Sequence, residues 1–249
     1  MRKLYFQFLT TSVVFLSIIS ASMQVNAQND PFITEWSIPA GTSAITIPAF
    51  GSGTGYTISW SGVATGSASG QLSPYTISGL TEGTLMVQIS DKLDHIDMNY
   101  TTDYDQLSKV VQWGDIHWTT MTYAFFACHN FDITATDVPD LSAVTNMSKM
   151  FVDCTSFIGN NSMNNWDVST VTNMEGMFSG AQLFNSDISN WDVSNVTTMR
   201  QMFEVCFSFN QPIGSWNVGK VTLMDWMFSS CSAFNQPIGN WDVSGIPAQ

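Results

Sequence analysis

The chain has little charge, and positive charge is especially scarce. Only 11% of its 249 residues are Asp, Glu, Lys or Arg, and 7 basic residues stand against 20 acidic ones, giving a net charge of −13. So acidic a chain repels phosphate backbones and anionic lipid headgroups, which argues against nucleic-acid binding and against membrane contact through basic residues. A coiled coil needs far more Glu and Lys. The 44% of apolar residues is enough for a core, so wholesale disorder is not expected.

Catalytic motifs are missing as well. The sequence contains no G-x-S-x-G, no H-E-x-x-H and no glycine-rich phosphate loop before a helix. His95, His117 and His129 have no acid or nucleophile at a motif spacing, so we interpret them as structural. We therefore predict that the protein is not an enzyme and has no catalytic, cofactor-binding or metal-binding residues.

The N-terminal apolar run is too short to be a good membrane span. It covers residues 4–19, follows Arg2 and Lys3, and leads to a small-residue site ending at Ala27. A span needs about 20 apolar residues, whereas this arrangement is typical of a secretory signal. We predict a signal peptide over residues 1–27, cleavage after Ala27, no membrane insertion afterwards, and a secreted or bacterial cell-surface location. The remaining chain keeps all 20 acidic residues and five basic ones, a net charge of −15.

What the sequence does have is a repeat with a period of 25 residues. The unit reads W-[DN]-V-[SG]-x-V-T-x-M-x-x-M-F-x-x-C-x-x-F-N-x-x-I-x-x-W, and it extends upstream in weaker form to about residue 107. Because one such unit cannot bury its own apolar residues, the units must stack as at least five coils, with like residues forming ladders. The ladder residues are Trp166, Trp191, Trp216, Trp241, Met174, Met199, Met224, Phe178, Phe203, Phe228, Cys128, Cys154, Cys206 and Cys231.

Within a coil, the spacing predicts one strand and one helix. Val171, Met174, Phe178 and Ala181 would share one face of a short helix, with Thr172 and Glu175 forming a capping box. Residues 188–193 would form a short strand or an extended segment. The expected fold is therefore an α/β repeat solenoid, leucine-rich-repeat-like, over residues 99–249.

The ladders leave alternatives open. The alternation of Trp-Asp-Val favours tryptophans in the core, while an exposed tryptophan ladder would suit sugar rings or a partner protein. The Asp or Asn after each Trp, and the Asn after Phe at 185, 210 and 235, are expected to bond backbone groups in turns. Because Ala181 takes the cysteine position in one coil, we favour buried thiols over a Cys206–Cys231 disulfide or a metal site.

The segment before the repeats has a different character. Short alternating runs separated by Gly and Ser clusters predict a small β-sandwich-like domain over residues 28–98. So small a domain buries little apolar area alone. We expect it to dock on the first coil and cover its open end.

The repeat unit resembles a known family. Val-Thr-Asn-Met-x-x-Met-Phe, followed by Phe-Asn-Gln-Pro-Ile-Gly-x-Trp-[Asp/Asn]-Val, is similar to the BspA-type leucine-rich repeats of bacterial surface proteins, also seen in mycoplasma lipoproteins. Residues 56–62 look like a degraded form of a turn in a PKD-like β-domain that often precedes such repeats. Ser59 and Ser61 depart from that motif, which puts a cation-binding role in doubt. The resemblance implies a surface or secreted interaction protein, in some relatives an adhesin, and offers no catalytic residues.

The predicted function is a non-enzymatic binding scaffold for an extracellular protein or glycan. Two alternatives remain: a carbohydrate-binding accessory module of an extracellular glycan-degrading system, and a structural surface spacer. The sequence ends as another coil should begin, so we expect a truncated or uncapped array, with possible end-to-end self-association through the last coil. Repeat proteins bind through positions that vary between coils. The candidate partner-binding residues are Asp187, Asn190, Arg200, Gln201, Lys220 and Asp225.

Overall fold

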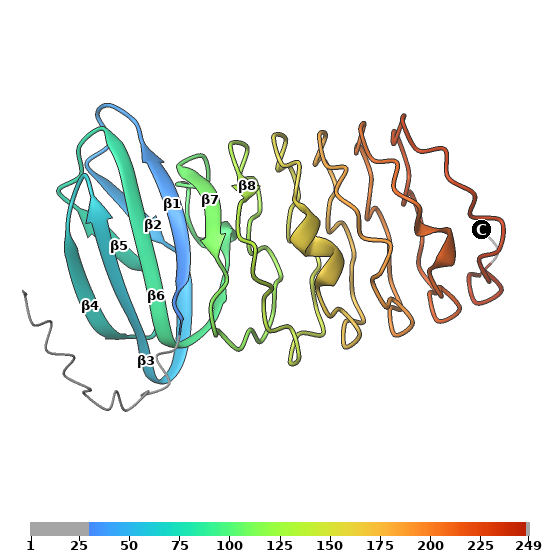
Figure 1. Cartoon of the computed structure of the whole chain (residues 1–249), viewed down its shortest axis with the longest axis horizontal. Helices are drawn as coiled ribbons and strands as arrows, with labels where there is room; N and C mark the ends of the chain where they lie inside the picture. Colours follow the sequence, from blue (N-terminus) through green and yellow to red (C-terminus); the bar gives the residue numbers. More distant parts are fainter. Residues whose placement is uncertain (1–29, 248–249) are drawn as a thin grey trace, which may run out of the picture.

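The structure, a computed structural model, describes residues 30–247 as a β-domain followed by a stack of coils (Figure 1). The elements are β1 (Phe32–Ile38), β2 (Ala44–Ile47), β3 (Ala49–Gly62), β4 (Gly66–Gln71), β5 (Tyr75–Ser78), β6 (Gly83–Ile96), η1 (Met98–Tyr100), β7 (Leu107–Gln112), β8 (Asp132–Ile133), η2 (Asn161–Asn165) and η3 (Ile213–Ser215). The predicted signal peptide lies outside the described residues. Within them, no helix has the length and apolar character needed to cross a membrane.

The β-domain is built from strands that bury alternate residues. In β1, Phe32, Trp36 and Ile38 point into the core, as alternation along a half-buried strand requires. β1 pairs antiparallel with β6, placing Trp36 opposite Leu85. The large sheet has the order β4-β3-β6-β1-β7-β8, and β2 and β5 form a separate two-stranded sheet. The stretch likened to a PKD-like turn, residues 56–62, lies within β3.

The β-domain and the first coil share one sheet. β7 belongs to the coil region but pairs antiparallel with β1, and it also pairs parallel with β8. Phe32 of β1 packs on Trp118 and Trp113, with ring centroids 5.1 and 5.9 Å apart. The β-domain therefore docks on the first coil, as expected, and covers that end of the stack.

Each coil contains a segment that we call the turn ribbon, with the pattern M-x-x-[MA]-F-x-x-C or, in one coil, a final Ala. The five turn ribbons are residues 121–128, 147–154, 174–181, 199–206 and 224–231. In the third, Met177, Ser179 and Ala181 donate their N–H groups to the carbonyls three residues earlier, at 3.2, 3.1 and 2.9 Å. The ribbon is thus a series of overlapping turns.

The N–H groups in between bond to the next coil. The Gly176 and Phe178 N–H groups donate to the Arg200 and Met202 carbonyls at 2.8 and 2.9 Å, and the equivalent bonds recur along the stack. The N–H groups that bond within the coil and those that bond to the next coil thereby find acceptors without a helix or a regular strand.

The predicted helix is therefore wrong, and with it the α/β leucine-rich-repeat-like solenoid that has a helix in every coil. Residues 30–247 contain no α-helix, only three short 3-10 turns. Each turn ribbon holds two residues with positive φ, such as Gln201 (57°) and Val205 (58°), and an α-helix cannot include them. The Thr172 and Glu175 capping box does not form, since the Glu175 N–H bonds to Asn173 Oδ1 at 2.9 Å.

The predicted strand over residues 188–193 is also wrong, because no strand forms there. Instead, isolated parallel bridges join Asn146 to Asn173, Asn173 to Thr198, and Thr198 to Leu223. Thr172, expected to cap a helix, belongs instead to a backbone ladder: the Thr197 N–H donates to the Thr172 carbonyl at 2.8 Å.

The core of the stack consists of ladders of like side chains. Phe178 lies parallel to Phe203, with centroids 5.6 Å apart, and Trp191 lies 6.2 Å from Trp166 and 6.5 Å from Trp216. Residues 25 apart in sequence are thus neighbours in space. The ladder tryptophans are 3–9% exposed, so the core interpretation is confirmed.

Polar turn residues complete each coil. Asp192 Oδ1 accepts the Ser194 N–H at 3.0 Å, and the same Asx turn forms at Asp167, Asn217 and Asp242. The Asn185 side chain accepts the Asn210 N–H of the next coil at 2.9 Å. These side chains cap backbone groups, as predicted.

Candidate functional site

Within the turn ribbons, variation between coils falls mainly on one surface. Positions 1, 4, 5 and 8 of the pattern are inward-facing Met, Phe and Cys or Ala, nearly all of them buried. Positions 2, 3, 6 and 7 differ from coil to coil. We call the surface formed by these variable positions the turn face: residues 122, 123, 126, 127, 148, 149, 152, 153, 175, 176, 179, 180, 200, 201, 204, 205, 225, 226, 229 and 230.

The backbone explains why position 3 displays its side chain. This residue has a positive φ in every coil: Tyr123 56°, Lys149 58°, Gly176 59°, Gln201 57° and Trp226 58°. Glycine would be the least strained choice there. Four of the five coils nevertheless carry a long side chain, so this column presents chemically different groups one coil apart.

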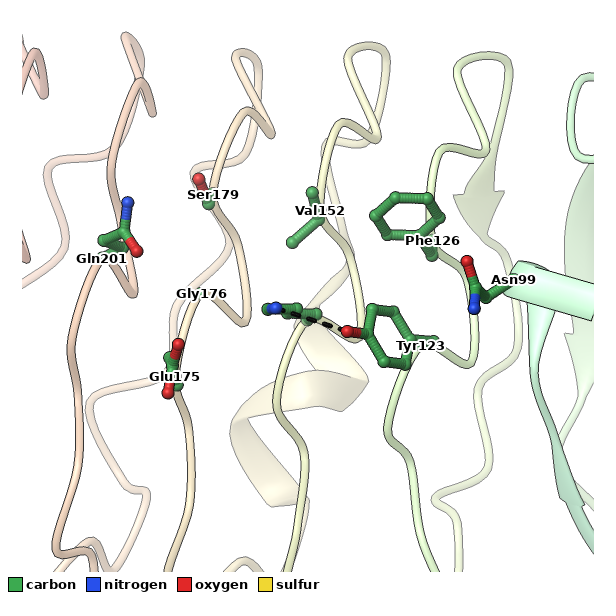
Figure 2. A pocket seen from close by; sticks show the side chains of 9 residues that line it. Asn99, Tyr123, Phe126, Val152, Glu175, Gly176, Ser179 and Gln201 are labelled. Atoms are coloured by element: carbon green, nitrogen blue, oxygen red, sulfur yellow. Dashed lines mark hydrogen bonds between the residues drawn. The ribbon is translucent and has the colours of Figure 1, made fainter.

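The turn face is hollowed at its centre (Figure 2). A cavity of about 350 Å³ is lined by Asn99, Tyr123, Phe126, Lys149, Val152, Glu175, Gly176, Ser179 and Gln201. All but Asn99 belong to turn ribbons, and Asn99 comes from η1 at the edge of the β-domain. The site therefore draws on four coils and the β-domain.

Some of the lining groups are held by neighbours. Lys149 Nζ lies 3.3 Å from the Tyr123 hydroxyl and 5.5 Å from the centre of its ring. Gln201 Nε2 donates to Glu204 at 2.6 Å. Tyr123 and Phe126 meet edge to face with centroids 5.5 Å apart. By contrast, the Glu175 carboxylate has no hydrogen bond or ion pair among residues 30–247.

Three of the six residues predicted to contact a partner lie on the turn face. Gln201 lines the hollow, and Arg200 and Asp225 occupy position 2 of their coils. Their side chains come from neighbouring turn ribbons.

The other three lie elsewhere and bond between coils. Asp187 accepts from Asn164 Nδ2 at 2.9 Å, the Asn190 N–H donates to Asn164 Oδ1 at 2.9 Å, and Lys220 Nζ donates to Asn195 at 2.7 Å. The structure does not bring these side chains together with the hollow.

Sequence reasoning missed most of the hollow. Tyr123, Phe126, Lys149 and Glu175 occupy variable positions, and a column-by-column comparison of the five turn ribbons would have found them. Gly176, which has no side chain, also lines the hollow, and no motif search would have singled it out.

The four cysteines are free and buried, so the disulfide alternative is wrong. Burial raises the pKa of all four thiols, to about 11 for Cys231, which suppresses the reactive thiolate. Cys206 Sγ instead donates to the Phe178 carbonyl at 2.9 Å. No group of three His, Cys, Asp or Glu residues suited to a metal ion occurs in the described part of the chain.

The histidines face acidic or aromatic neighbours rather than the hollow. His117 pairs with Asp140, and His129 Nδ1 lies 2.6 Å from Asp105. The pKa of His95 is lowered, mainly because the ring is partly buried. The His129 contact links the first coil to the loop before β7, and the His117 contact links the first two coils.

The fold and site together define a repeat protein of stacked coils with a variable surface on its turn ribbons. Residues 119–241 match a family model described as "Mycoplasma protein of unknown function, DUF285", and this range covers most of the stack. No curated protein and no solved structure matches the chain.

Proposed function

We propose that this protein is a non-enzymatic binding protein, secreted or held at a bacterial cell surface, whose turn face recognises an extracellular protein or glycan. The observation that carries the proposal is the division within each turn ribbon between nearly uniform, mostly buried positions and variable, mostly half-buried or exposed positions. A purely structural spacer gives no reason for long side chains at a backbone conformation that favours glycine.

The likeness to BspA-type repeats and the predicted signal peptide support an extracellular role. The buried thiols and the absence of catalytic motifs in the sequence agree with binding rather than catalysis. The carbohydrate alternative cannot use the ladder tryptophans, since their rings lie in the core. Any sugar contact would instead involve the aromatic side chains of the turn face.

The proposal is tested by arrays of extracellular-matrix proteins and glycans probed with the purified protein. In the test variant, Tyr123, Lys149 and Gln201 are all replaced by Asn, which tolerates positive φ. In the control variant, Asp187→Asn and Lys220→Gln change polar residues away from the turn face.

We expect the test variant to bind about tenfold or more weakly than the wild type, and the control variant to bind normally. Both variants should keep the wild-type far-ultraviolet circular dichroism. Loss of binding in the control variant alone, or no ligand on either array, would contradict the proposal.

A further inference from the structure

The hollow on the turn face is lined by Gly176, the one glycine at position 3 of the five turn ribbons. A Cβ atom added at Gly176 would lie 3.5 Å from Lys149 Cγ, 3.8 Å from Val152 Cγ2 and 3.9 Å from Ser179 Cβ, all ordinary contacts. The equivalent residues Tyr123 and Gln201 have nearly the same φ. Other coils therefore carry side chains at this strained backbone position, and a side chain at position 176 would project beside Lys149, Val152 and Ser179.

Gly180, four residues further on, is different. A Cβ there would collide with the Asp153 side chain and lie 3.2 Å from the Asp153 backbone. A side chain at position 180 would thus displace Asp153 in the neighbouring coil. The contrast separates a glycine crowded by the neighbouring coil from one whose Cβ position meets only ordinary contacts.

The walls of the hollow combine an apolar side with a polar side. Tyr123, Phe126 and Val152 supply partly exposed apolar surface. Opposite them, the Glu175 carboxylate and the Ser179 hydroxyl form no hydrogen bond with another residue in the range 30–247. Acceptors and donors therefore lie side by side next to an apolar surface.

Formal charge within the hollow is balanced. Lys149 is its one cation and Glu175 its one anion. A strongly anionic ligand would meet the Glu175 carboxylate and the net charge of −13, and a strongly cationic one would meet Lys149. The ligand chemistry that fits is uncharged, with hydroxyl groups that both donate and accept and a C–H face that packs on the aromatic side chains.

We propose that the Gly176 hollow binds one neutral sugar residue of a glycan, an inference that rests on the proposed function of the turn face. Asn99 also lines a second cavity of about 410 Å³, together with Thr46, Tyr100, Thr101, Thr102 and Asp103. Tyr100 is 64% exposed there. Because Asn99 lines both cavities, a longer oligosaccharide would continue past Asn99 toward the β-domain.

The test is saturation-transfer-difference NMR of the full chain with single methyl glycosides. The neutral probes are methyl glucoside, methyl galactoside, methyl mannoside and methyl N-acetylglucosaminide, and the charged probes are methyl glucuronide and a tri-lysine peptide. The filled variant is Gly176→Asn. The matched control is Gly41→Asn, at another glycine with positive φ (87°), open space around it and a place in the loop between β1 and β2.

We expect at least one neutral glycoside to receive saturation from the wild type and from Gly41→Asn, and to lose it with Gly176→Asn. Equal saturation with Gly176→Asn, no neutral glycoside bound, or binding of a charged probe alone would overturn the proposal. The proposed function fails separately: a ligand from the arrays that is lost in the Tyr123, Lys149 and Gln201 variant but kept by Gly176→Asn leaves the turn face intact and removes only the sugar hollow.

Discussion

The β-domain and the coil stack both form layers, but they direct side chains differently. In β6, buried residues such as Leu85, Val87 and Ile89 alternate with outward ones, as in any half-buried strand. In a turn ribbon, two inward residues such as Met177 and Phe178 are flanked by pairs of outward ones. The ribbon therefore displays adjacent residues together, which makes a denser variable surface than a strand provides.

The two regions also differ in how they are held together. Strand β3 pairs with β6 and β4, which lie close to it in a local antiparallel arrangement. Each turn ribbon depends instead on the coils before and after it, through backbone bonds and aromatic ladders. We expect a defect in the stack to act through neighbouring coils, as in other repeat proteins.

The largest loss of stability should follow from removing one ring of the phenylalanine ladder. Phe178 is fully buried and stacks on Phe151, Phe184, Phe203 and Trp191 at 5.4, 4.0, 5.6 and 6.2 Å. Phe178→Ala should lower the free energy of unfolding by about 3–5 kcal/mol, because a cavity would interrupt the stack. Urea unfolding followed by tryptophan fluorescence measures it. A loss below about 1 kcal/mol would show that the coils do not depend on the ladder.

Substitution of the two glycines of the third turn ribbon should lower stability by smaller amounts, and by different amounts at the two positions. Both have positive φ, so alanine is strained at either position. Gly180→Ala adds a collision with Asp153 and should cost about 2–3 kcal/mol, whereas Gly176→Ala should cost about 1 kcal/mol. Thermal unfolding of the two variants gives the comparison. Equal costs would mean that both glycines serve packing and that the hollow is incidental.

The cysteine ladder should tolerate change better than the aromatic one. Cys206→Ala removes the Sγ contact to the Phe178 carbonyl but copies Ala181, which fills the same position one coil earlier. We expect a loss of about 1 kcal/mol in urea unfolding. Reaction with a thiol reagent provides a check, since the native wild type should label slowly and the urea-unfolded chain rapidly. Fast labelling of the native protein would contradict the buried ladder.

Periodicity was enough to predict the stacking, the buried ladders and the turn roles of Asp and Asn, because these depend on which residues recur. It failed for the backbone between them. The apolar spacing of Met174, Phe178 and Ala181 suits a helix face and also suits overlapping turns. Gly176 and Gly180 inside the supposed helix were a warning against it, since glycine is unfavourable in a helix interior.

The turn face could be predicted only in part for a related reason. Variation between coils pointed to Arg200, Gln201 and Asp225, whereas Lys220 looked equally variable but bonds to Asn195 in the previous coil. The direction of a side chain depends on the sign of φ, and Gln201 has a positive φ that nothing in its residue type indicates. The structure was needed to tell a displayed residue from one that joins coils.

The smallest change in stability is expected at the Asx turns, where Asn217 already takes the place of Asp in one coil. The pKa of Asp192 is lowered mainly by hydrogen bonds from the Ser194 side chain and backbone N–H. A lowered pKa in the folded state means that this stabilisation is present above the unfolded pKa of about 3.9 and is lost as the pH falls through the folded value. Because Asn217 makes the same turn, Asp192→Asn should change stability by less than about 0.5 kcal/mol at pH 7. Thermal unfolding between pH 7 and pH 2 should show that the variant loses slightly less stability on acidification than the wild type. An identical or larger loss of stability would mean that the carboxylate charge plays no part in the turn.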